Sequence, residues 1–71
     1  MTGARTEVVA VRGMHCGGCE RTVASAVQAV PGVGSAHADF VAEEVEVTYD
    51  PAETGLEAIR AAVRDAGFTP A

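Results

Sequence analysis

The amino-acid sequence predicts an α+β fold in which two helices lie on one face of a four-stranded antiparallel sheet. Three observations predict it: two segments repeat apolar residues at helical spacing, two alternate apolar and polar residues, and a β-branched run lies near the start of the chain. A chain of 71 residues is too short to build two independent cores. We therefore expect a single domain over residues 1–71, with residues 1–6 frayed.

The first half of the chain predicts a strand, a loop and a helix. Residues 7–11 (Glu-Val-Val-Ala-Val) favour a strand, and Arg12-Gly13 predicts the loop that follows. Pro31-Gly32 ends the helix that comes next. From about residue 19 to residue 30, this helix repeats apolar side chains at helical spacing: Val23, Ala26, Val27 and Val30.

Two strands joined by a hairpin follow. The connection over residues 41–44 is short and polar enough for a hairpin, so we expect the flanking strands to pair antiparallel. Residues 45–49 alternate, with Val45, Val47 and Tyr49 on one face. Residues 33–40 alternate in the same way, with Ala36, Ala38 and Phe40 on one face.

The last third of the chain predicts a second helix and a short strand. Thr54-Gly55-Leu56-Glu57 matches a capping box, in which the Thr54 hydroxyl and the Glu57 carboxylate bind free N–H groups at a helix start. Gly67 suits the left-handed residue after a helix, and residues 68–70 predict the strand. The resulting order, βαββαβ, is that of a ferredoxin-like fold. The apolar stripe of the second helix is Leu56, Ile59, Val63 and Ala66.

Charge and hydropathy exclude two classes of partner. The formal net charge is −5, so a surface that binds nucleic acid is not expected. No apolar run approaches the roughly 18 residues of a membrane span, and the first 12 residues lack the apolar stretch of a signal peptide. We therefore expect a cytoplasmic protein without direct membrane insertion. Cytosolic thiol pools would keep its cysteines reduced.

The segment Gly13-Met14-His15-Cys16-Gly17-Gly18-Cys19 contains the two cysteines of the chain. Cys19 falls near the first turn of the predicted helix, where free N–H groups and the positive end of the helix dipole stabilise thiolates. Two soft, anionic sulfurs select thiophilic ions such as Cu(I). Zinc fits less well, because it prefers four ligands in a tetrahedron. The sequence therefore predicts that Cys16 and Cys19 bind Cu(I).

Several alternatives stay open. His15 is a candidate third ligand, although an exposed histidine beside a ligand is more often solvated. A small thiol oxidoreductase is the main alternative of another class, but that fold needs a longer chain and a Pro or bulky residue inside the motif. No nucleophile is paired with a base, so we do not expect an enzyme. Ag(I), Hg(II) and Zn(II) remain candidate ions. We expect a monomer without metal, and two facing loops could form a metal-bridged dimer.

The motif Gly13-Met14-x-Cys16-x-x-Cys19 on a βαββαβ pattern resembles the heavy-metal-associated domain. The resemblance covers roughly residues 7–70 and implies that Cys16 and Cys19 are the metal ligands, that Met14 is a buried anchor under the loop, and that Phe68 packs beside the site. It further implies a copper chaperone that passes Cu(I) to a copper-transporting P-type ATPase or another copper-receiving protein. The alternative is a detached N-terminal domain of such an ATPase. His15 and Phe68 depart from the commonest pattern of the family, which leaves this choice open.

Overall fold

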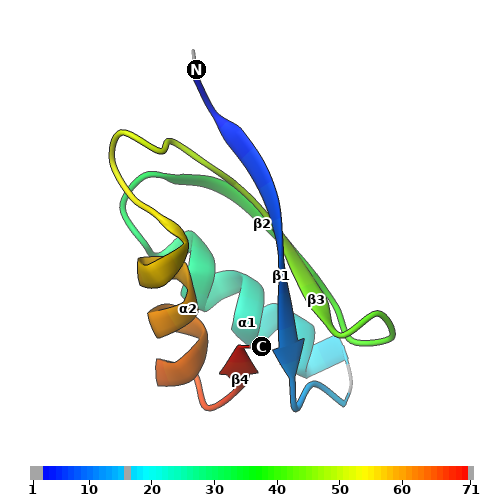
Figure 1. Cartoon of the computed structure of the whole chain (residues 1–71). Helices are drawn as coiled ribbons and strands as arrows, with labels where there is room; N and C mark the ends of the chain where they lie inside the picture. Colours follow the sequence, from blue (N-terminus) through cyan, green and yellow to red (C-terminus); the bar gives the residue numbers. More distant parts are fainter. Residues whose placement is uncertain (1–2, 16, 71) are drawn as a thin grey trace.

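A computed structural model describes residues 3–15 and 17–70 of the chain. Its strands form one antiparallel sheet in the order β2-β3-β1-β4. Both helices cover the same face of this sheet (Figure 1), which confirms the ferredoxin-like fold predicted from the sequence. The elements in chain order are β1 (Arg5–Arg12), α1 (Gly17–Gln28), β2 (Val33–Asp39), β3 (Glu44–Tyr49), α2 (Leu56–Asp65) and β4 (Thr69–Pro70).

The core between the sheet and the helices consists almost entirely of aliphatic side chains. Among the buried residues of the described part of the chain, Tyr49 is the one aromatic side chain, at 4% exposure. Burying one valine or isoleucine contributes about 1.5–3 kcal/mol, so the aliphatic residues supply most of the driving force for folding. The largest fully buried side chains are Val9, Val11, Val23, Val27, Val45, Val47, Ile59 and Val63. No helix in the described part of the chain is long and apolar enough to cross a bilayer.

The expectation that residues 1–6 are frayed is wrong for Arg5 and Thr6, which belong to β1. Arg5 pairs with Tyr49, and Thr6 pairs with Thr48. The two threonine hydroxyls, 3.1 Å apart, form a hydrogen bond across the strands. Strand β3 continues to Tyr49 and therefore offers pairing partners to the start of β1.

The expectation that Phe40 continues the alternating strand over residues 33–40 is also wrong. Strand β2 ends one residue earlier, at Asp39, and the Phe40 side chain is 37% exposed. The reason is local, because the Asp39 carboxylate accepts hydrogen bonds from the N–H groups of Val41 (2.9 Å) and Ala42 (3.2 Å). Aspartate favours such turns over continued strand pairing, so the chain leaves the sheet before Phe40 can face the core.

Both helices differ from expectation at their ends. Helix α1 begins at Gly17 and ends at Gln28, two residues before the expected end, because the residue preceding Pro31 disfavours helical geometry. The expected capping box is absent. Helix α2 has Gly55 as its N-cap, with no side-chain hydrogen bond to the cap, so Thr54 stands one position too early to close the first turn. Gly67 adopts a positive φ of 96°, as predicted for the residue after α2.

Three connections meet at one end of the molecule: the β1–α1 loop, the β2–β3 turn and the α2–β4 connection (Figure 1). Backbone contacts join them. Val11 near the end of β1 donates a hydrogen bond to the carbonyl oxygen of Glu43 in the β2–β3 turn (2.8 Å). Arg12 pairs with Thr69 of β4. The β1–α1 loop, which contains the cysteine motif, is therefore flanked by the other two connections.

Candidate metal centre

Helix α1 begins at the end of the molecule where the three connections meet (Figure 1). Cys19 lies in its first turn. Its side chain is half-buried and packs against the hydrophobic core. The first N–H groups of a helix lack intrahelical partners, and the helix dipole places partial positive charge there. Cys16, the second predicted ligand, lies outside the described residues.

The start of the loop is fixed by a glycine and a buried methionine. Gly13 has a positive φ of 101°, and a Cβ atom added there would lie 3.6 Å from Cδ1 of Phe68. The next residue, Met14, is 5% exposed and belongs to the core cluster. The chain thus turns sharply out of β1 at Gly13 and is held to the core at Met14. His15, the third residue of this segment, is exposed.

The positive φ of Gly13 predicts that Gly13→Ala destabilises the protein. The new Cβ atom has adequate space, so the cost is backbone strain of about 1–2 kcal/mol. Thermal unfolding followed by circular dichroism should show a midpoint lower by about 4 °C or more. Gly17→Ala is the matched control, because Gly17 lies in α1 without a positive φ and a Cβ there would meet nothing within 4 Å. An unchanged midpoint for Gly13→Ala would contradict the prediction.

Phe68 lies on the other side of the loop start. It is half-buried, packs against the core, and immediately precedes β4. Its N–H group donates a hydrogen bond to the carbonyl oxygen of Val63 (3.2 Å), which holds the residue against the end of α2. Its ring is close to Gly13 at the base of the β1–α1 loop. Phe68 can therefore limit the access of water to this side of the loop.

The second histidine of the chain lies on a strand and not in the segment with the cysteines. His37 is exposed on β2, where it pairs with Glu46 of β3. It lines a shallow groove together with Glu20, Asp39 and other acidic side chains. Within residues 3–15 and 17–70, no three histidine, cysteine, aspartate or glutamate side chains are placed to hold a metal ion together.

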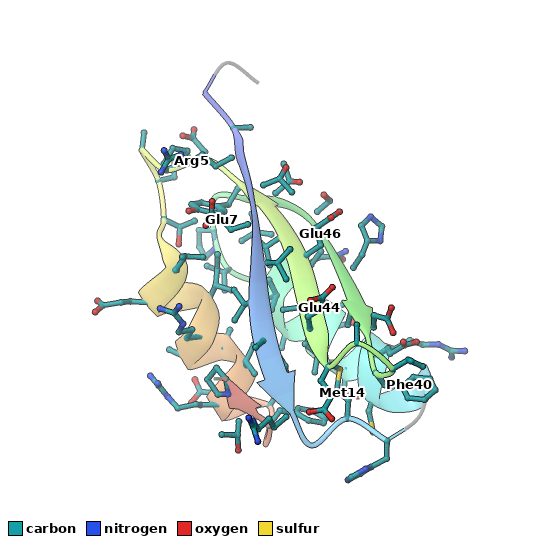
Figure 2. The ribbon with its side chains drawn as sticks, turned by 45° about the vertical axis from the view of Figure 1, so that its right-hand side comes forward. Arg5, Glu7, Met14, Phe40, Glu44 and Glu46 are labelled. Atoms are coloured by element: carbon teal, nitrogen blue, oxygen red, sulfur yellow. The ribbon has the colours of Figure 1, made fainter. Side chains whose placement is uncertain are left out.

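Glu20 is a residue near the site that the sequence did not single out. It follows Cys19 in α1, and its carboxylate oxygen Oε2 accepts a hydrogen bond from the backbone N–H of Phe40 (2.9 Å). Figure 2 shows Phe40 and Met14 at the same end of the molecule, with Glu44 and Glu46 further along the sheet. The contact joins residues that are 20 positions apart. An acidic residue in a first helical turn is common, so the sequence carries no signal for this particular partner.

Comparisons with known proteins agree with this arrangement. The model of the heavy-metal-associated domain matches residues 8–69. The probable copper-transporting ATPase PacS of Synechococcus elongatus is 40% identical over 62 residues, which are 87% of this chain but 8% of that protein's length. The mercuric transport protein periplasmic component of Serratia marcescens is 36% identical over 64 residues, 90% of this chain and 70% of that protein. A solved structure of the CopZ metallochaperone has a TM-score of 0.91 at 31% identity, covering 94% of this chain and 100% of that one. The chain therefore belongs to the heavy-metal-associated domain family.

Proposed function

We propose that this protein is a cytoplasmic copper chaperone that binds one Cu(I) ion between the thiolates of Cys16 and Cys19. It passes the ion to a partner such as a copper-exporting P-type ATPase. The observation that carries the proposal is the position of Cys19, in the first turn of α1, after a loop on which His15 is exposed. Cys16 stands three residues earlier in the same motif. The domain extends over residues 1–71 and acts by binding and transfer, without catalysing a reaction.

The choice of Cu(I) rests on the softness of the two sulfurs and on the relatives. Thiolates prefer thiophilic ions over Mg²⁺ or Ca²⁺, and two sulfurs alone do not complete the tetrahedron that Zn²⁺ prefers. The names of two of the relatives compared above refer to copper transport or to CopZ. Hg(II) is the competing ion, because a third relative is named as a mercuric transport protein. The cytoplasmic location belongs to the same proposal, since both ligands must be reduced thiols.

Transfer proceeds by ligand exchange. A thiolate of the partner adds to the bound Cu(I) as a third ligand, the bond to one of the two original sulfurs breaks, and a second partner thiolate then displaces the other. The copper stays in the Cu(I) state throughout and is never released to water. The position of Cys19 at an end of the molecule supports this route, because a partner can approach without displacing the core. A detached domain of a copper ATPase would use the same chemistry and remains the alternative.

An anaerobic Cu(I) titration of the reduced protein, followed by native mass spectrometry, tests the proposal. We expect one Cu(I) per chain at low metal loading, retained against a competing Cu(I) chelator, with zinc displaced by copper. Parallel titrations with Hg(II) and Ag(I) rank the ions. A second species with two chains sharing metal would identify the bridged dimer. Failure of the reduced protein to retain Cu(I) against the chelator would refute the assignment.

A further inference from the structure

The β2–β3 turn, residues 40–43, contacts both elements that flank the loop with the cysteine motif, β1 and α1. On the β1 side, the N–H of Val11 donates a hydrogen bond to the carbonyl oxygen of Glu43 (2.8 Å). On the α1 side, the N–H of Phe40 donates a hydrogen bond to the Glu20 carboxylate (2.9 Å). The turn therefore connects the strand that precedes the loop with the helix turn that contains Cys19.

The conformation of the β2–β3 turn is itself fixed by local hydrogen bonds, so the turn can keep β1 and the start of α1 at a set distance. The Asp39 carboxylate holds two of its N–H groups, those of Val41 and Ala42. Glu43 has a positive φ of 55°, a conformation that few residues other than glycine adopt readily. A short turn with its own hydrogen bonds keeps a fixed length between Phe40 and Glu43. The two ends of the loop are consequently held at a set separation.

The simplest role for Glu20 is to stabilise the start of α1 through its charge. An acidic residue in the first turn of a helix is stabilised by the helix dipole without any specific partner. Glu57 in the first turn of α2 is such a residue, because it is exposed and the cap of its helix shows no side-chain hydrogen bond. Glu20 differs, since its side chain is half-buried and reaches across to the β2–β3 turn. The difference between the two glutamates indicates a role for Glu20 beyond the dipole.

We propose that Glu20 is a positioning residue, which braces the metal-binding loop through the β2–β3 turn and sets the place of Cys19 before metal binds. This inference rests on the proposed Cu(I) site. Without the brace, the first turn of α1 can move relative to β1, and the loop must be ordered when the ion binds. Ordering at that moment lowers affinity, whereas a loop that is already ordered avoids this loss.

Glu20→Ala removes the brace, and Glu20→Gln retains an oxygen that can accept the hydrogen bond from Phe40 while removing the charge. We expect Glu20→Ala to weaken Cu(I) binding about fivefold in a chelator competition, as for the loss of one ordinary hydrogen bond. Glu20→Gln should bind within about twofold of the parent protein. Glu57→Ala is the matched control, because it removes one carboxylate from the first turn of the other helix.

Amide exchange measured by NMR on the metal-free protein provides a second readout. We expect faster exchange of the Phe40 amide in Glu20→Ala, with shifted resonances of Gly17 and Gly18, and parent-like values in Glu20→Gln and Glu57→Ala. Asp39→Ala, which removes the hydrogen bonds that the Asp39 carboxylate accepts from Val41 and Ala42 inside the turn, should change the same resonances. Parent-like Cu(I) affinity in Glu20→Ala, or equal losses in Glu20→Ala and Glu20→Gln, would overturn the brace.

The two proposals fail in different ways. If the parent protein does not retain Cu(I), the proposed function fails, and the metal-free exchange data alone decide whether Glu20 orders the loop. If the parent binds Cu(I) tightly and Glu20→Ala matches it, the metal site stands and the brace is rejected.

Discussion

Cys19→Ser is expected to abolish retention of Cu(I) against a competing chelator, and Cys16→Ser should have the same effect. Replacing a thiolate by a hydroxyl removes one of two soft ligands and leaves an oxygen for which Cu(I) has little affinity. Changes outside the direct ligands of a metal already cost about 10- to 100-fold in affinity, so the loss of a ligand should cost more than about a hundredfold. The measurement is an anaerobic titration of each reduced variant against a Cu(I) chelator.

Two controls make this result specific. The double variant Cys16→Ser with Cys19→Ser sets the baseline for adventitious copper. Circular dichroism of Cys19→Ser separates loss of a ligand from loss of structure, because the Cys19 side chain also packs against the core. A single variant that kept copper as tightly as the parent protein would exclude the two-sulfur site.

Met14→Ala is expected to produce the largest loss of stability among the substitutions near the loop. Met14 is 5% exposed within the core cluster, and truncating such a side chain to alanine costs about 2–5 kcal/mol of unfolding free energy. The core of a protein this small rarely supplies more than about 3–5 kcal/mol, so much of the variant should be unfolded at ambient temperature. Chemical denaturation followed by circular dichroism measures the change.

Met14→Leu separates packing from metal binding. Leucine conserves the volume, so the expected cost is below about 1.5 kcal/mol, but it removes the thioether sulfur. If Met14 is an anchor under the loop, Met14→Leu keeps the Cu(I) affinity of the parent protein. A marked loss of affinity in a folded Met14→Leu would instead identify the thioether as a ligand.

The prediction of the fold from sequence succeeded where the pattern reflects burial. Alternation at Val45, Val47 and Tyr49 predicted the inward face of β3, and all three residues are buried. Helical spacing likewise predicted Ile59 and Val63, both of them fully buried. These signals are strong because a shift of the element by one residue would turn its whole apolar face toward solvent.

The failures involve polar side chains with more than one local partner available. Thr54 and Glu57 fit a capping pattern, yet α2 begins with Gly55 as its cap. Asp39 continued the alternation of β2, yet its carboxylate starts a turn and leaves Phe40 exposed. Such competing hydrogen bonds differ by little free energy, and sequence spacing cannot rank them.

The sequence by itself determined the order of the elements, the valine-rich core and the association of a CxxC motif with the start of a helix. Each of these follows from local spacing and from the burial of apolar area. Only the tertiary structure decided that the β2–β3 turn lies beside the loop with the cysteine motif, that Glu20 reaches Phe40, and that Arg5 and Thr6 join the sheet. The reason is that these contacts join residues 20 or more positions apart in the chain. Their partners are chosen by the packing of whole elements against one another, and no local pattern records that choice.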